Sequence, residues 1–175
     1  MSIELEGRAR VVGDDINADY IITSRRKRET IDASHLARYL LETIDPAFAA
    51  TVRPGDLLVA GRNFGCGSAM EVAATVILAA GIRAVVAKTF ARTFYRNAIN
   101  NGLLPIECDT SAIREGDALT IRLDGGRWEV RNLTRSQRLA AGTLPPIVAA
   151  ILDCGGLVEA VRRHGSLRKL LSPAG

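Results

Sequence analysis

The chain of 175 residues has few of the side chains from which redox, metal and base-stacking sites are built. It has three cysteines, two histidines and only 5% aromatic residues. Cys66, Cys108 and Cys154 are odd in number and widely spaced, which does not suit a disulfide framework. They also lack the close pairing of zinc or iron–sulfur ligands, so no metal site is predicted on this chain. Any metal chemistry has to come from elsewhere.

Long apolar runs are also absent. A membrane-spanning helix needs about 20 apolar residues, and a run such as residues 72–80 reaches roughly half of that length. The opening Met-Ser-Ile-Glu-Leu-Glu-Gly-Arg lacks the basic-then-apolar plan of a signal peptide, so we expect a cytoplasmic protein with no membrane partner. With 47% hydrophobic and 24% charged residues, the composition fits one domain over residues 1–175.

The net charge of +4 is small, but much of it is concentrated in one place. Residues 24–28, Ser-Arg-Arg-Lys-Arg, carry four cations in a row. Aromatic residues do not alternate with these cations as they do on a base-stacking surface, so nucleic acid is a disfavoured partner. Two interpretations remain open: a solvated loop, or a loop whose Arg25, Arg26 and Arg28 bind a small polyanionic substrate.

The order of the predicted elements indicates an α/β domain with a mixed sheet. Apolar strands that alternate with helices in the middle of the chain are typical of parallel strand–helix–strand units. Alternating residues around the turn at 124–126 are typical of an antiparallel hairpin. The expected strands are residues 9–12, 56–60, 82–87, 103–107, 118–123 and 127–133. The expected helices are residues 31–44, 68–81 and 90–99, with one or two more in 144–171, broken at the glycines 155–156.

The segment best suited to chemistry is the glycine loop, residues 61–68, with the sequence Gly-Arg-Asn-Phe-Gly-Cys-Gly-Ser between a strand and a helix. Small residues such as Gly65, Cys66 and Gly67 let the backbone approach a ligand, and the N–H groups of a helix start favour an anion. The loop matches neither common nucleotide-binding glycine motif. Ser68 also fits a capping box with the acidic residue three positions later. A carboxylate or phosphate site and a purely structural cap therefore both remain open.

Residues 59–68 and 80–106 resemble the small subunit of 3-isopropylmalate dehydratase, and residues 13–22 and 153–159 resemble the two ends of that family. The resemblance implies a swivelling β/β/α domain of the aconitase superfamily that works with a separate large subunit. In that family the large subunit carries the [4Fe–4S] cluster, so no cofactor is expected on this chain. The implied reaction isomerises a 2-hydroxy dicarboxylate by dehydration and rehydration. The expected substrate is 2-isopropylmalate of leucine biosynthesis, or a close analogue.

The resemblance also implies roles for individual residues. Ser68 matches the family serine that acts as the base on the proton alpha to a carboxylate. Asp19 matches an aspartate at the active site, where it is expected to orient the serine region. The segment after Ile22 matches the part of the family that reads the variable group of the substrate.

Two positions depart from the family pattern. Met70 stands where the family usually has an arginine that holds a substrate carboxylate, and Ala18 replaces a threonine. A hydrogen bond to a charged group is typically worth about 1.5–3 kcal/mol, and a thioether cannot replace it. One interpretation is an active enzyme on a related substrate, with Arg25, Arg26 or Arg28 supplying the charge. The second is a diverged subunit that is non-catalytic or of homoaconitate or methylmalate type. A basic binding module is the third.

Overall fold

The computed structural model of the chain describes residues 3–68 and 70–170. Its strands are β1 (Ile3–Val11), β2 (Leu57–Ala60), β3 (Ala84–Ala87), β4 (Leu104–Glu107), β5 (Ala118–Asp124), β6 (Arg127–Asn132) and β7 (Gln137–Leu139). Its α-helices are α1 (Ala18–Ile21), α2 (Ser24–Glu29), α3 (Ala33–Leu36), α4 (Phe48–Thr51), α5 (Glu71–Ala79), α6 (Arg92–Asn100), α7 (Pro146–Asp153), α8 (Leu157–His164) and α9 (Leu167–Leu170). A 3₁₀ helix, η1 (Ala37–Tyr39), follows α3.

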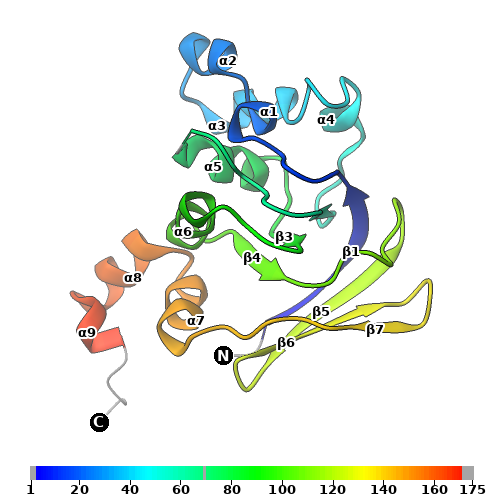
Figure 1. Cartoon of the computed structure of the whole chain (residues 1–175). Helices are drawn as coiled ribbons and strands as arrows, with labels where there is room; N and C mark the ends of the chain where they lie inside the picture. The colour runs from blue at the N-terminus through cyan, green and yellow to red at the C-terminus, as the bar shows by residue number, and fades with distance from the viewer. Residues whose placement is uncertain (1–2, 69, 171–175) are drawn as a thin grey trace.

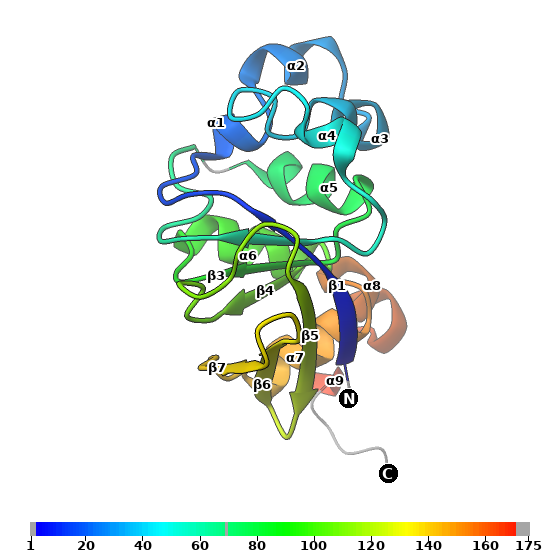
Figure 2. The same cartoon turned by 90° about the vertical axis from the view of Figure 1, so that its right-hand side faces the viewer.

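The strands form one mixed sheet in the order β4-β3-β2-β1-β5-β6-β7. Strands β1 to β4 pair in parallel, and β5 to β7 continue the sheet in antiparallel pairing. The long strand β1 joins the two parts, because residues 3–8 pair with β5 and residues 9–11 pair with β2. Figures 1 and 2 show α1 to α5 on one side of the parallel strands and the β5–β7 region on the other. The predicted α/β class with a mixed sheet is confirmed.

Strands β2 and β3 are buried along their whole length. Successive residues of a strand point to opposite faces of the sheet. Leu58 and Ala60 accordingly belong to the core shared with α1, α3, α4 and α5, whereas Leu57 and Val59 belong to the core shared with β5, β6, α7 and α8. Because both faces of a parallel sheet are covered, its strands are uninterrupted apolar runs, which is why the sequence predicts them well.

Most predicted elements are confirmed with small shifts at their ends, but the strand predicted at residues 9–12 is β1, which begins at Ile3, so the part that pairs with β5 was not predicted. The predicted helix 90–99 is α6, and the predicted strand 103–107 is β4. The hairpin turn at 124–126 is present, with φ angles of 54° at Gly125 and 79° at Gly126 that favour glycine. The helices α7 and α8 are separated at residues 155–156, as expected, while the short strand β7 was not predicted.

The prediction that residues 24–28 form a loop is wrong, because they lie in helix α2. Thr23 is the N-cap, and its hydroxyl accepts a 3.4 Å hydrogen bond from the Arg26 amide. Arg26 donates from Nε and Nη2 to the two carboxylate oxygens of Glu42, each at 3.0 Å. The cap and this neutralising contact allow a helix to form despite four adjacent cations.

The prediction of one helix over residues 31–44 is also wrong. Only α3 and η1 form there, and Leu41 adopts a left-handed backbone with φ of 58°. Its amide turns away to donate to the carbonyl of Ile21 at 3.0 Å. Leu36 and Leu40 are buried all the same, so their spacing reflects burial in the core and not a continuous helix.

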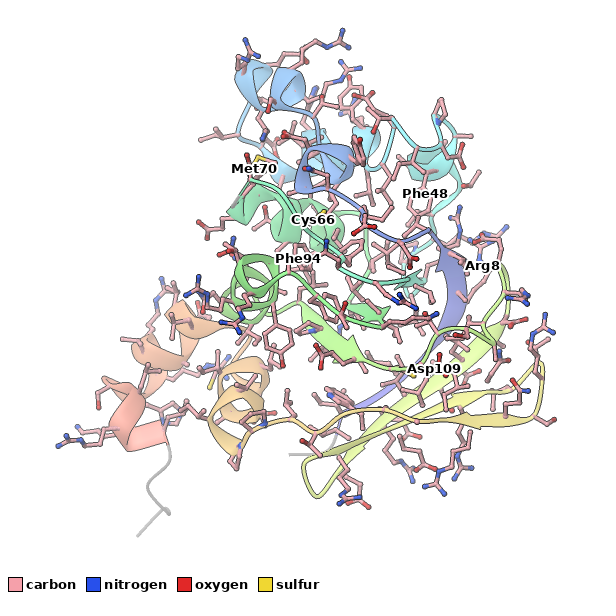
Figure 3. All side chains as sticks on the ribbon, viewed as in Figure 1. Arg8, Phe48, Cys66, Met70, Phe94 and Asp109 are labelled. Atoms are coloured by element: carbon pink, nitrogen blue, oxygen red, sulfur yellow. The ribbon has the colours of Figure 1, made fainter. Side chains whose placement is uncertain are left out.

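A cluster of buried charges holds the second half of β1. Arg10, only 5% exposed, has its guanidinium 4.5 Å from the ring centroid of Phe48 and donates to Glu115 at 2.7 Å. Arg8 donates two hydrogen bonds to Asp56, at 3.1 and 2.6 Å. Burial by itself raises the pKa of Asp56, but the hydrogen bonds and positive charges around it bring that pKa below its ordinary value. Figure 3 places Arg8 and Phe48 across the molecule from Met70.

In the described part of the chain, no helix combines the length and the apolar character needed to cross a membrane.

Candidate active site at the glycine loop

Three loops meet at the carboxyl ends of the parallel strands β1, β2 and β3. The glycine loop lies in the middle, where the Gly61 amide donates to the carbonyl of Gly13 at 3.1 Å. On its other side, the Phe64 amide donates to the carbonyl of Thr89 at 3.0 Å. Ligand sites of open α/β sheets commonly form outside this edge. The topology therefore places the glycine loop where a binding site is expected.

Hydrogen bonds join the glycine loop to the segment that carries Asp19. The Gly65 amide donates to the carbonyl of Ile16, and the Ala18 amide donates to the carbonyl of Cys66, both at 2.8 Å. Asn17 and Cys66 also pair as an isolated parallel bridge. Asp19 follows Ala18 directly, so the structure brings it to the same edge as residues 65–67.

Gly65 and Gly67 are needed for the packing of this loop against its own chain. Both have left-handed backbones, with φ of 79° and 84°. A Cβ on Gly65 would lie 2.3 Å from the Cβ of Phe94, and one on Gly67 would lie 2.4 Å from the Asn17 side chain. The two glycines thus have a structural explanation, and their predicted approach to a ligand stays a prediction. Figure 3 shows Cys66 near Phe94 at this part of the molecule.

Ser68 lies at the exposed rim of the loop. The prediction that it caps the next helix is wrong, because α5 begins at Glu71 with Met70 as its N-cap. Met70 makes no capping hydrogen bond through its side chain. The physical reason is the extended backbone of Met70, with φ of −125° and ψ of 112°, which keeps residue 70 outside the helix. The capping role therefore does not account for this serine.

Asp19 lies at the start of the short helix α1. Its amide donates to the side chain of Asn17 at 2.9 Å, which fixes the helix start. Its carboxylate accepts a 2.7 Å hydrogen bond from the Ser24 hydroxyl and lies 3.5 Å from the ammonium of Lys27. Asp19 thereby links the glycine loop to helix α2.

The cations of α2 point in different directions. Arg26 is engaged by Glu42 and lies 3.7 Å from the centroid of the Tyr39 ring, and the hydrogen bond to Glu42 raises the pKa of its guanidinium. Arg25 and Arg28 are exposed. Their binding to substrate stays a prediction, as does that of Arg26.

Lys27 is a site residue that the sequence did not single out. Its ammonium contacts Asp19 and the sulfur of Met70. Figure 3 shows Met70 between the helices labelled α2 and α5 in Figure 1. The only signal in the sequence was that Lys27 belongs to the basic run 24–28. A loop prediction does not assign the side chains of that run to different faces. Recognising the helix would have separated Lys27 from Arg26.

Two cavities flank this region. One, of about 490 Å³, lies next to the loop segment 88–91. It is lined by Phe90, Arg92, Tyr95, Arg96 and Glu107. Burial, together with the charge of Glu107, raises the pKa of Tyr95. The other, a groove of about 360 Å³, is lined by Lys27, Thr30, Ile31, Glu71, Val72 and Thr75.

The cysteines do not form a ligand set. Cys108 and Cys154 are buried, while Cys66 is half-buried in the glycine loop. Burial raises the pKa of the Cys108 thiol to about 12. Among residues 3–68 and 70–170, no three His, Cys, Asp or Glu side chains are grouped so that they could hold a metal ion. These residues do not fit an iron–sulfur cluster.

The fold and this loop define a domain of the aconitase type. The profile of the family described as Aconitase C-terminal domain matches residues 16–111, which include Asp19 and the glycine loop. The crystal structure of 3-isopropylmalate dehydratase from Methanocaldococcus jannaschii aligns with a TM-score of 0.88 and 41% identity, covering 93% of this chain and 96% of that one.

Curated relatives agree with the structural comparison. The 3-isopropylmalate dehydratase small subunit 1 of Methanopyrus kandleri is 46% identical, covering 92% of this chain and 94% of its own length. The small subunit from Moorella thermoacetica is 44% identical, covering 91% and 95%. The chain belongs to the family of 3-isopropylmalate dehydratase small subunits, which confirms the resemblance found in the sequence.

Proposed function

We propose that this chain is the small subunit of a hydro-lyase that isomerises a 2-hydroxy dicarboxylate by dehydration and rehydration. The substrate class is 2-isopropylmalate or a close analogue, and residues 1–175 act as one swivel domain in the cytoplasm. The observation that carries the proposal is the hydrogen bonding of residues 16–18 to the glycine loop. It holds the segment that carries Asp19 against the glycine loop that ends at Ser68, in a chain whose relatives bear the dehydratase name.

The small-subunit name implies a large-subunit partner, and we propose that this partner holds a [4Fe–4S] cluster. The proposal is supported by the unsuitability of the described cysteines as ligands. Lewis-acid chemistry on the departing hydroxyl belongs to that cluster. This chain contributes the proton transfer and part of the substrate contacts.

Ser68 is proposed as the base that takes the proton alpha to a carboxylate. A serine oxygen acts this way only if its surroundings stabilise the alkoxide. The nine-residue helix α5 begins three residues later at Glu71, and its N-cap residue makes no side-chain hydrogen bond to the first N–H groups. These N–H groups and the helix dipole favour negative charge at this end of α5.

Asp19 is proposed as a positioning residue. Its carboxylate accepts from Ser24 and faces Lys27, so it ties α2 to the start of α1. The backbone of Gly65, Cys66 and Gly67 is proposed to contact the substrate. The exposed Arg25 and Arg28, and Arg26 once released from Glu42, are proposed contacts to a substrate carboxylate.

A differently specific or non-catalytic subunit is the second candidate, and Met70 in place of the family arginine is the observation that favours it. A basic binding module is disfavoured because Arg26, one of the four cations in residues 24–28, is already paired with Glu42. Nucleic acid is therefore not a proposed partner.

The test is reconstitution with a cluster-bearing large subunit. The isolated chain is expected to be colourless and inactive, and the complex to interconvert 2-isopropylmalate with its unsaturated dicarboxylate, followed by ultraviolet absorbance. 2-Methylmalate and homoaconitate serve as alternative substrates. Turnover by the isolated chain, or a well-formed complex that is inactive on all three, would overturn the proposal.

A further inference from the structure

We propose that Lys27 holds a substrate carboxylate in place of the arginine that the family usually has at position 70. This inference rests on the proposed function, since it assigns a substrate contact in the same site. It differs from the expectation drawn from the sequence, which looked for the missing charge among Arg25, Arg26 and Arg28.

The first argument is position. The Lys27 ammonium contacts the sulfur of Met70, the side chain that occupies the arginine position. Its side chain is only 20% exposed, so the charge is held in this place by its surroundings. Asp19 fixes it from the other side, with 3.5 Å between the ammonium nitrogen and the carboxylate oxygen. The positive charge missing from residue 70 is thus present beside it, supplied from another helix.

The second argument is availability. An ammonium group has three hydrogen-bond donors and a thioether is a weak acceptor. The contacts described for Lys27 are the 3.5 Å contact with Asp19 and the contact with Met70, which leave donor capacity for a ligand. Arg26 is different, because both carboxylate oxygens of Glu42 already bind its guanidinium. Lys27 also lines the groove of about 360 Å³, so a ligand can reach it from solvent.

The third argument is chemical consequence. A guanidinium grips a carboxylate with a planar two-point contact, whereas an ammonium is a compact point charge with freely rotating donors. Lysine therefore selects for a carboxylate at this position but constrains the orientation of that carboxylate less than arginine does. A substrate held in this way keeps both carboxylates and is bound with more tolerance for the group between them than an arginine would allow.

The test uses the complex with the large subunit and the better of two probes, 2-isopropylmalate and 2-methylmalate. Lys27→Met is expected to raise KM by about 10- to 100-fold, the factor that corresponds to losing one charged hydrogen bond, with a small effect on kcat. Lys27→Arg keeps the cation and is expected to stay within about fivefold of the unchanged complex. Lys169→Gln, an exposed lysine on α9, is the charge-matched control and is expected to leave KM unchanged.

The decisive variant moves the charge. Lys27→Met combined with Met70→Arg returns a cation to the family position, so KM should recover most of its loss. An unchanged KM in Lys27→Met with an active complex overturns the inference and leaves the proposed function standing. Loss in Lys27→Met that neither Lys27→Arg nor the double variant restores indicates a structural role and also overturns it. If the complex without any substitution is inactive on both probes, the proposed function is overturned, and this inference with it.

Discussion

The Ala18 amide donates a 2.8 Å hydrogen bond to the Cys66 carbonyl, which joins the start of helix α1 to the glycine loop. This bond and the Asn17–Cys66 bridge hold the segment before Asp19 against the loop that ends at Ser68. The site is therefore built by backbone pairing between two loops at the ends of neighbouring strands. Side chains at this edge can vary while the arrangement persists, which is how the family position at Met70 can change without loss of the loop.

Gly67→Ala tests that pairing. Gly67 and Gly116 have almost the same left-handed backbone, with φ of 84° and 83°. A Cβ on Gly67 would lie 2.4 Å from Asn17, whereas one on Gly116 would have no neighbour within 4 Å. Gly116→Ala should thus cost only the backbone strain, about 1–2 kcal/mol, and Gly67→Ala should cost more and displace residue 17. Thermal unfolding followed by circular dichroism measures the difference, and equal shifts in Tm would contradict it.

Ser68→Ala tests the proposed base. Removing the hydroxyl should lower kcat of the reconstituted complex at least 100-fold, which is within the usual contribution of a general base. Ser68 is exposed and caps no helix, so the free energy of unfolding and the assembly with the large subunit should not change. Ser34→Ala, an exposed serine on α3, is the matched control. Undiminished turnover in Ser68→Ala would remove this residue from the mechanism.

The sequence predicts the parallel part of the sheet because burial on both faces leaves its mark as runs such as residues 57–60 and 84–87. It fails on residues 31–44, where the spacing of Leu36 and Leu40 imitates a helix that Leu41 interrupts with a positive φ. Nothing local to Leu41 requires that backbone, since its cause is the long-range hydrogen bond to Ile21.

The candidate site shows the same division. The glycine loop could be identified from its own segment between a strand and a helix, and Asp19 from the resemblance of residues 13–22 to the family. The contact of Lys27 with Met70 joins residues from different elements, and neither has a feature that points to the other. The contact depends on how α2 is oriented about its own axis. The Thr23 cap and the pairing of Arg26 with Glu42 fix that orientation.

Thiol labelling checks the environments of the three cysteines in the isolated chain. Burial raises the pKa of Cys108 to about 12, so almost none of it is thiolate at pH 8, and Cys154 is also buried. Cys66 is partly exposed and should react with iodoacetamide first. Peptide mass spectrometry over a time course gives the order in which the cysteines are modified. Modification of Cys108 as fast as Cys66 would show that the core shared with β5, β6, α7 and α8 opens readily.

Asp56 should make the stability of the chain depend on acid. Its pKa is lower in the folded chain than the ordinary aspartate value of about 3.9, because hydrogen bonds from Arg8 and the amide of Arg53 outweigh the effect of burial. A group with a lowered folded pKa stabilises the fold above its unfolded pKa and loses that contribution as pH falls through the folded value. Asp56→Asn should therefore lower the free energy of unfolding at pH 7, and the difference from the unchanged chain should shrink below about pH 4. Urea unfolding of both chains at pH 7 and pH 3 measures this, and a difference that stays constant between the two would show that the carboxylate charge contributes nothing.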